Sequence, residues 1–318
     1  MSLEDKETDR KLVQILQALN EKANAIPKPK REPYVSKHKK HDDKFPSWFK
    51  LSKFGQQIAD ELEGFIEESD PVLLIGGTGM GKTVILEMIA LKLGRESVGF
   101  NCYTGMDIAQ LIGIWHPQKD GTIVWQDGVL SQGIRMGGII RIEEYTRANP
   151  ELKSRLFGIL DSRNRTWNLF ENGTVSIDVP KETVIVASAN PTGNGYVGTM
   201  REDKASMSRF AGVLTINEPL ADEKYALMDT LGDDETVDKI LDFAKACRKD
   251  QNTYLSTRDL HFFAKALKRG IEPKRVCESV LLPKYEGNES NLLTHCRAYF
   301  ETFDGESIKE TVESEVAR

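Results

Sequence analysis

A glycine-rich loop followed by lysine and threonine is the strongest chemical signal in the sequence. Residues 73–83 read LLIGGTGMGKT, so the pattern G-x-x-x-x-G-K-T follows an apolar strand and precedes a helix. Its glycines let the backbone curl so that successive N–H groups point at phosphate oxygens, and the helix adds its positive dipole end. The pattern predicts a nucleotide phosphate site formed by Gly76, Gly77, Thr78, Gly79, Met80, Gly81, Lys82 and Thr83.

Lysine, threonine and two later carboxylates have separate roles in this predicted site. Lys82 offers a positive charge to the β and γ phosphates, and the Thr83 hydroxyl is a ligand for Mg²⁺. Glu143 and Glu144 end the apolar strand GGIIRIEE, whose carboxyl edge should adjoin the loop. Glu143 would hold Mg²⁺ through its water shell, and Glu144 would polarise the attacking water. We therefore expect a site for ATP and Mg²⁺; a solvated acidic pair is the alternative interpretation of the glutamates.

Two residues of that strand depart from the usual pattern. A shorter aspartate is usual where Glu143 stands, and the extra methylene shifts the carboxylate by about one bond length. Arg141 interrupts a strand that should be buried on both faces of the sheet. Its side chain must therefore reach either a carboxylate or the edge of the sheet.

The elements that position these residues alternate between short apolar runs and helical stretches, as in a mostly parallel α/β sheet. We expect strands at residues 72–75, 97–101, 139–142, 183–187 and 213–216. Two hairpins interrupt the alternation: one carries Asp120-Gly121, and the other carries Asn172-Gly173, a signal for a type I′ turn. Residues 221–303 should be helical. The predicted fold class is a P-loop NTPase αβα sandwich with two inserted hairpins, followed by an all-helical lid domain.

Three segments follow from this pattern. Residues 1–45 should form an amphipathic helix and a flexible arm, residues 46–218 the nucleotide-binding domain, and residues 219–318 the lid domain with a C-terminal tail. The arm at residues 28–44 holds seven Lys or Arg against three acids. A solvated linker is the plainer interpretation, and contact with nucleic acid or an acidic partner is the alternative.

Bulk composition excludes several classes of protein. The 318 residues carry a net charge of −6, which argues against a surface that binds nucleic acid as a whole. No apolar run approaches the roughly 18 residues needed to cross a bilayer, so no membrane association is expected. The charged N-terminus lacks the apolar core of a signal peptide, so we expect a cytoplasmic protein. The four scattered cysteines show no metal-binding spacing and should be buried, reduced thiols.

From about residue 46 to 270 the sequence resembles the AAA+ ATPases of the MoxR and CbbQ group. The resemblance is strongest to the small ATPase subunit of cobalt chelatase, the CobS type. It rests on four stretches: GGIIRIEEYTRANPELKSRLFGILDSR at 137–163, VIVASANPTGNGYVGT at 184–199, GYVGTMREDKASMSRFAG at 195–212 and LSTRDL at 255–260. The subfamily assignment rests mainly on the third of these.

The resemblance implies a role for several polar residues. Asn190 would be the sensor-1 asparagine that orients water against the γ-phosphate, with a simple turn before a proline as the alternative. Arg209 would be the arginine finger for a neighbouring subunit's nucleotide, and Arg201 is the second candidate. Arg258 would be the sensor-2 arginine, which touches the γ-phosphate from the lid. Arg147 matches an arginine suited to a salt bridge across the ring.

The resemblance also implies an assembly and a client. ATP would bind between subunits of a homo-oligomer, most simply a hexamer, and hydrolysis would move the lid and hairpins against a protein client. A natural partner would carry a von Willebrand A domain, and cobalt chelation is one possible task. The hairpins match inserts that face the central pore, although hairpin aromatics more often pack across strands. The candidates for gripping a client are Trp115, Trp125, Trp167 and Phe170.

Two other functions stay open from the sequence. A nucleic-acid motor would use the basic arm and the hairpins to touch a phosphate backbone. A nucleotide-gated scaffold that barely hydrolyses is motivated by Glu143. Stimulation of turnover by DNA or RNA would favour the first of these, and absence of turnover would favour the second.

Overall fold

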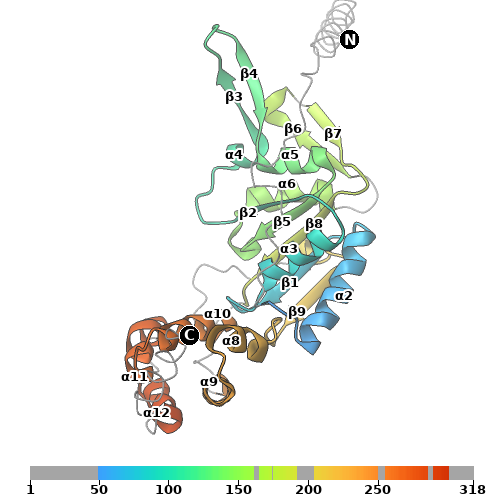
Figure 1. Ribbon diagram of the computed structural model, residues 1–318. Coiled ribbons are helices and arrows are strands. Elements are labelled where there is room, and N and C mark those ends of the chain that lie inside the picture. Colours follow the sequence, from blue (N-terminus) through green and yellow to red (C-terminus); the bar gives the residue numbers. More distant parts are fainter. Residues whose placement is uncertain are drawn as a thin grey trace, which may run out of the picture. The chain divides into compact units, whose positions relative to one another are not determined.

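The computed structural model describes residues 49–160, 165–173, 175–191, 204–249, 255–285 and 289–300 (Figure 1). The chain divides into two compact units, residues 1–44 and 45–318, and every described residue belongs to the second. The expected N-terminal helix and the basic arm at 28–44 therefore lie outside the described residues. So do Arg201 and half of the 195–212 run.

A parallel sheet forms the centre of the second unit (Figure 1). Its strand order is β2-β5-β8-β1-β9, and each neighbouring pair is parallel. The strands are β1 (Val72–Gly76), β2 (Ser97–Asn101), β5 (Ile139–Glu143), β8 (Val184–Ala189) and β9 (Gly212–Ile216). All five predicted strands are present, with β8 beginning one residue later and ending two residues later than expected. The α/β fold class is confirmed.

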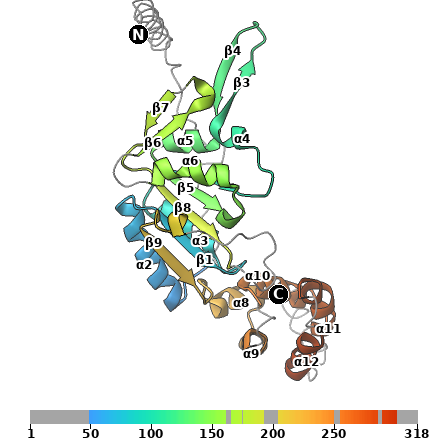
Figure 2. The same ribbon diagram turned by 180° about the vertical axis from the view of Figure 1, so that it is seen from behind.

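Helices cover both faces of this sheet (Figure 2). On one face lie α2 (Lys53–Glu67) and α3 (Lys82–Lys92), and on the other lie α4 (Ile108–Ile112), α5 (Val129–Met136) and α6 (Pro150–Leu160). Neighbouring residues of a strand contribute to different cores, because side chains alternate across a strand. Leu73 packs with the α5 and α6 side, whereas Leu74 packs with the α2 and α3 side.

Two antiparallel hairpins are inserted between sheet elements, as predicted. They are β3 (Gly113–Pro117) with β4 (Ile123–Asp127), and β6 (Thr166–Leu169) with β7 (Val175–Asp178). The predicted type I′ turn in the second hairpin is wrong. Its strands are joined through a 3₁₀ helix, η2 (Phe170–Asn172). A type I′ turn needs two residues with positive φ, but here Gly173 has φ 64° while Asn172 ends the helix.

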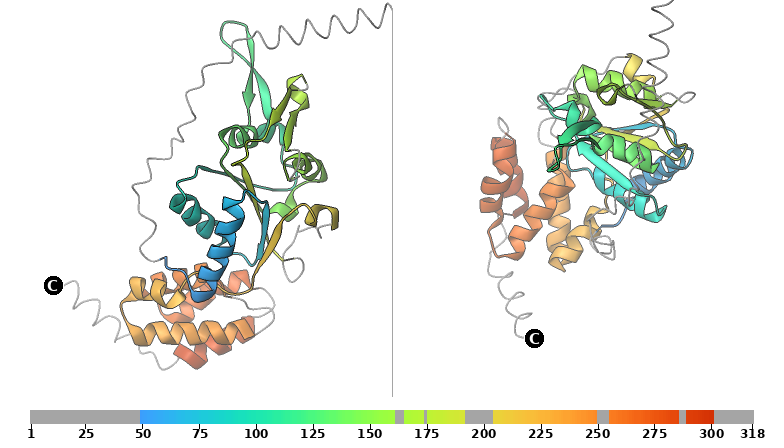
Figure 3. Two further views of the ribbon diagram at one scale, coloured as in Figure 1. Left: turned by 90° about the vertical axis from the view of Figure 1, so that its right-hand side faces the viewer. Right: turned by 90° about the horizontal axis from the view of Figure 1, so that it is seen from above.

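A helical segment follows the last strand of the sheet (Figure 3). Its described helices are α8 (Glu223–Leu231), α9 (Asp234–Lys249), α10 (Thr257–Lys268), α11 (Pro273–Val276), a π-helix at Cys277–Leu281 (η3), a 3₁₀ turn at Leu282–Lys284 (η4) and α12 (Glu289–Phe300). They enclose a separate core around the rings of Phe243, Phe263 and Phe300. This confirms the predicted helical C-terminal segment. All four cysteines are free and buried, as expected.

The residues just before α2 contact the residues that lead into α8, the first helix of the C-terminal helical segment. Leu51 forms an antiparallel bridge with Ala221, and the Ser52 amide donates to the carbonyl of Leu220 at 2.9 Å. The Leu220 amide in turn donates to the carbonyl of Met80 at 3.2 Å. Because Met80 belongs to the phosphate loop, the residues that precede α8 contact this loop directly. Within the described residues, no helix is both long and apolar enough to cross a membrane.

Candidate nucleotide site

The predicted phosphate loop connects β1 to α3 and depends on glycine at several positions. Gly79 and Gly81 have φ values of 78° and 100°, which side chains rarely adopt. A Cβ on Gly79 would also lie 2.6 Å from Oγ of Ser256, at the start of α10. The loop is therefore strained for other residues and is in close contact with the helical segment.

Lys82, the first residue of α3, points back into the loop. Its ammonium donates to the carbonyl oxygens of Gly76 at 2.6 Å and Gly77 at 2.9 Å, and to Oδ1 of Asn190 at 3.2 Å. Burial lowers the pKa of Lys82 to about 8, although the charges of Glu144 and Glu143 act to raise it. A phosphate group would be a stronger acceptor for this cation than two neutral carbonyls.

Thr83 and Glu143 form the candidate magnesium site. The Thr83 hydroxyl donates to Oε2 of Glu143 at 3.0 Å, from the first turn of α3 to the last residue of β5. A hydroxyl and a carboxylate are the hard oxygen ligands that Mg²⁺ prefers. The described residues contain no cluster of three or more His, Cys, Asp or Glu that could hold a metal alone. The pair therefore fits a Mg²⁺ ion that is shared with nucleotide phosphates.

Glu144 and Asn190 meet beside this pair. The Asn190 amide donates to both carboxylate oxygens of Glu144, at 3.0 and 2.9 Å, while its own oxygen accepts from Lys82. Asn190 follows β8, the neighbour of β1, and is 4% exposed. Glu144 has a φ of 56°, a left-handed backbone that is costly outside glycine and that clusters at functional sites. One buried amide thus joins the lysine of the loop to the second glutamate.

Arg258 and its surroundings place the helical segment at the phosphate loop. A Cβ on Gly79 would lie 3.4 Å from Cβ of Arg258, which is itself exposed in the first turn of α10. Glu223 holds this turn, because it accepts from the Thr257 hydroxyl at 2.7 Å and from both terminal nitrogens of Arg248 at 2.7 Å. The structure therefore brings Arg258 beside the loop.

Arg209 and Arg147 also had predicted roles. Arg209 follows α7 (Lys204–Met207), and its guanidinium lies 5.0 Å from the centre of the Phe157 ring. Arg147 lies in a 3₁₀ turn, η1 (Tyr145–Arg147), with Nε 3.6 Å from Oε2 of Glu144 in the same chain. The structure thus places Arg147 next to Glu144 of its own chain.

The four predicted gripping aromatics differ in exposure, and Trp125 is half-buried with its ring 5.6 Å from that of Trp115 across the hairpin. Trp115 is 51% exposed and Phe170 is 61% exposed, whereas Trp167 is 1% exposed and donates from Nε1 to Oγ of Ser131 at 2.9 Å. The expectation that Trp167 grips a client is therefore wrong, because its ring belongs to the core of the sheet domain. Sequence reasoning also missed four exposed aliphatic residues of the hairpins: Ile114, Ile123, Val124 and Val175.

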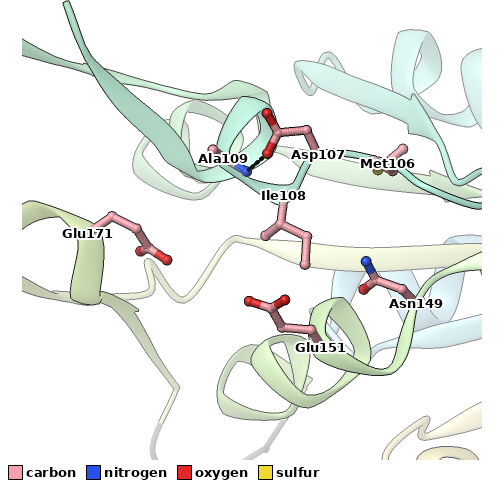
Figure 4. Close-up of a pocket in the computed structure, with 7 residues that line it drawn as sticks. All are labelled: Met106, Asp107, Ile108, Ala109, Asn149, Glu151 and Glu171. Atoms are coloured by element: carbon pink, nitrogen blue, oxygen red, sulfur yellow. Dashed lines mark hydrogen bonds between the residues drawn. The ribbon is translucent and has the colours of Figure 1, made fainter.

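A cavity of about 340 Å³ lies between α4, α6 and η2, apart from the nucleotide site (Figure 4). It is lined by Met106, Asp107, Ile108, Ala109, Asn149, Glu151 and Glu171. Its carboxylates already have partners in the chain. Asp107 caps α4 at the Ala109 amide, and Arg155 pairs with both Glu151 and Glu171. None of the expected nucleotide-binding residues lines this cavity.

The parallel sheet and the phosphate loop define a P-loop NTPase, and comparison with known proteins identifies the AAA+ class. Residues 71–210 match the AAA domain family of the dynein-related subfamily. Protein CbbQ of Hydrogenophilus thermoluteolus is 30% identical over 234 residues, 71% of this chain and 85% of CbbQ. The denitrification regulatory protein NirQ of Pseudomonas aeruginosa is 29% identical over 217 residues, 66% of this chain and 81% of NirQ. Protein NorQ of Paracoccus denitrificans is 28% identical over 218 residues, 67% of this chain and 78% of NorQ.

The chain therefore belongs to the MoxR-type AAA+ ATPases, the family of CbbQ, NirQ and NorQ. This is an ATP-hydrolysing P-loop family, and its members bind nucleotide with Mg²⁺. The resemblance that the sequence motifs indicated is confirmed at this level.

Proposed function

We propose that the chain hydrolyses Mg-ATP within a homo-oligomeric ring, most simply a hexamer, and uses the energy to remodel or activate a partner protein. The observation that carries the proposal is the position of Asn190, whose amide contacts both Lys82 and Glu144. A group that orients water must lie between the residue that binds the γ-phosphate and the residue that accepts the proton. Asn190 has this position.

The residues of the site divide the chemistry among them. The backbone of the loop and Lys82 would bind the phosphates, and Thr83 with Glu143 would hold Mg²⁺, which neutralises charge on the phosphate oxygens. Glu144 would accept the proton of the attacking water, and Asn190 would orient that water. Both carboxylate oxygens of Glu144 accept from the Asn190 amide nitrogen, so the two side chains are held together.

The position of Arg209 supports assembly into a ring. Val72 of β1 pairs with Gly212 of β9 in parallel register, so Arg209 precedes β9 at the amino edge of the sheet. The phosphate loop follows β1 at the opposite, carboxyl edge, roughly 16 Å away along five strand residues. The backbone of Arg209 thus lies at the edge opposite its own phosphate loop, and we propose that the side chain reaches the nucleotide of a neighbouring subunit. Arg258 would contact the γ-phosphate from within the chain.

The exposed hairpin residues support a protein client. Their large side chains are apolar, which suits contact with a protein surface better than contact with phosphate groups. The relative NirQ is named a regulatory protein, which agrees with a task of activating another protein. We further propose that the natural partner carries a von Willebrand A domain. The finer CobS-type assignment is a proposal as well, resting mainly on the 195–212 run.

A measurement of turnover and mass on the purified full chain tests this function. Phosphate release should require Mg²⁺ and stop in EDTA, and light scattering with ATP should give a mass of several subunits. ATP-dependent assembly without phosphate release would support the scaffold instead, and a monomer without turnover would exclude both. Stimulation by DNA or RNA that weakens with salt would support the nucleic-acid motor. Affinity capture with ATP-trapped protein would then identify the client.

A further inference from the structure

Arg141 is a charged residue in an interior strand of the sheet. Strand β5 lies between β2 and β8, and Ile140 and Ile142, which flank the arginine, are fully buried. The Arg141 side chain is 15% exposed. A guanidinium in such surroundings is costly unless an acidic group compensates its charge. The contacts of Arg141 therefore indicate why this residue stands in the strand.

Arg141 and the magnesium ligands form one connected set. Arg141 and Glu143 are two apart on β5, so they face the same side of the sheet, and Thr83 and Glu87 are four apart on α3, so they lie one turn apart on the helix. Nη1 of Arg141 lies 3.0 Å from Oε1 of Glu87 and 3.8 Å from Oε1 of Glu143. The other oxygen of Glu143, Oε2, accepts from Thr83 at 3.0 Å. Each oxygen of Glu143 thus has its own neighbour.

The edge strand leaves space for this arrangement. Gly99 of β2 pairs with Arg141 of β5. A Cβ on Gly99 would lie 3.0 Å from Nη2 and 3.1 Å from Nε of Arg141. Any larger residue at position 99 would push the guanidinium away from its place. The glycine in the edge strand and the arginine in the interior strand are therefore matched.

We infer that Arg141, anchored by Glu87, is a positioning residue that keeps Oε2 of Glu143 directed at Thr83, an inference that rests on the proposed function. Glutamate has one more torsion than aspartate, so ordering its carboxylate costs more side-chain entropy. Arg141 limits that freedom from the side opposite Thr83. Because Glu87 cancels the charge of Arg141, the group keeps the single net negative charge of a lone carboxylate. The arginine at position 141 thus compensates for the extra freedom of the glutamate at position 143.

The test removes the anchor without changing the charge of the site. Arg141→Met combined with Glu87→Gln deletes one positive and one negative charge together. Mn²⁺, a paramagnetic substitute for Mg²⁺, is titrated into the full chain saturated with a non-hydrolysable ATP analogue, and bound metal is measured by electron paramagnetic resonance. Mn²⁺ affinity should fall about tenfold, as expected for a partner that orients a metal ligand. When Glu143 is also replaced by aspartate, the Arg141→Met and Glu87→Gln pair should lower Mn²⁺ affinity by about twofold or less.

A matched control and a milder variant complete the experiment. Lys92→Met with Glu63→Gln removes another ion pair of α3, which joins α2 at 2.6 Å, and should leave Mn²⁺ affinity unchanged. Arg141→Lys keeps the charge but not the planar guanidinium. It should weaken Mn²⁺ binding when residue 143 is glutamate but not when it is aspartate. This variant keeps the test valid if the double variant fails to fold.

Two results would overturn the positioning role. Either Mn²⁺ affinity is unchanged by both Arg141 variants, or it falls equally with glutamate and aspartate at position 143, in which case the arginine supports the strand and not the side chain. Failure of the proposed function is distinct from both. It would appear as absence of nucleotide binding or turnover in the unaltered chain, whereas failure of the positioning role alone would leave Mn²⁺ binding and ATP hydrolysis by the unaltered chain in place.

Discussion

The nucleotide site and the two hairpins differ in whether their characteristic side chains contact one another or face solvent. At the carboxyl edge of the sheet, the polar groups contact one another: Lys82 reaches Asn190, Asn190 reaches Glu144, and Thr83 reaches Glu143. On the hairpins, large apolar side chains face solvent instead, with Trp115 51% exposed. The polar groups of the first region are paired with one another, whereas the hairpins leave much of their apolar surface exposed in the described part of the chain.

This difference matches the two proposed tasks, catalysis at the nucleotide site and binding of a client at the hairpins. Groups that are already held by neighbours need little reorganisation during a reaction, which favours catalysis. Exposed apolar groups gain free energy only when another surface covers them. The two regions are nevertheless connected. Trp115 donates to the carbonyl of Glu171, whose carboxylate pairs with Arg155 of α6, the helix that closely follows Glu144 in the chain. Displacement of the Glu144 segment can thus be transmitted to both hairpins.

The largest expected effect concerns Arg209, the proposed arginine finger. Arg209→Ala should lower the ATPase rate by about 10³ to 10⁵, because an arginine finger stabilises charge that develops in the transition state. Nucleotide affinity should change much less. The measurement is phosphate release at saturating Mg-ATP, with Arg201→Ala as the control at the other candidate position. A comparable loss in the control alone would move the finger to Arg201.

Mixed rings test whether Arg209 acts across the subunit boundary. Arg209→Ala mixed with Glu144→Gln should recover activity, because some sites then draw an intact glutamate from one subunit and an intact arginine from its neighbour. If mixed rings form but no ratio restores turnover, Arg209 does not serve a neighbouring site.

The next effect separates binding from chemistry within the network. Glu144→Gln keeps the side-chain shape but removes the base, so the rate should fall by about 10² to 10⁴ while ATP still binds. Light scattering should show that the ring persists with ATP. Glu151→Gln, on the exposed first turn of α6, is the matched control and should keep the rate. Turnover of Glu144→Gln at the unaltered rate would remove Glu144 from the role of base.

Lys82→Ala should weaken ATP binding by about 100-fold, since it removes the charged hydrogen bonds to the phosphates. Titration with a fluorescent ATP analogue measures the change. Lys92→Ala, at the other end of α3, removes an exposed lysine and should leave the affinity intact. Unchanged affinity in the Lys82 variant would contradict the assignment of the phosphate loop.

The sequence predicted the sheet well, and the predicted nucleotide-site residues could be named from it, because both depend on local patterns. The phosphate loop is contiguous, and Glu143 with Glu144 ends an apolar run that can only be an interior strand. Since parallel strands bring their carboxyl ends together, the end of the strand that precedes Asn190 also placed this residue near the loop. These predictions needed the order of elements but no distances between side chains.

Long-range contacts are what the sequence left open. The sequence indicated that Arg141 must contact either a carboxylate or the edge of the sheet. It could not identify Glu87 as the partner, because Glu87 lies 54 residues earlier, in α3. Trp167 was expected on a client-binding surface because hairpin position alone does not reveal that Ser131, 36 residues away, accepts its indole hydrogen. The turn at Asn172-Gly173 failed similarly, because a local turn preference does not determine the loop between β6 and β7.

The smallest expected effect compares two tryptophans that stand on neighbouring hairpins. Trp167→Phe should lower the free energy of unfolding by about 1 to 2 kcal/mol, because it removes the hydrogen bond to Ser131 and leaves a gap in the core. Trp115→Phe should change it by about 0.5 kcal/mol or less, because half of that side chain already faces solvent. Urea unfolding followed by circular dichroism measures both without relying on tryptophan fluorescence. Neither variant should alter basal phosphate release.

Acrylamide quenching of fluorescence provides an independent check on this pair. Trp115→Phe should remove emission that the quencher reaches, whereas Trp167→Phe should remove emission that it does not, since the two rings differ from 51% to 1% in exposure. Equal destabilisation by the two variants would mean that the first hairpin is packed as firmly as the second. The hairpins would then lack a free apolar surface, and the proposed client contact would have to lie elsewhere on the ring.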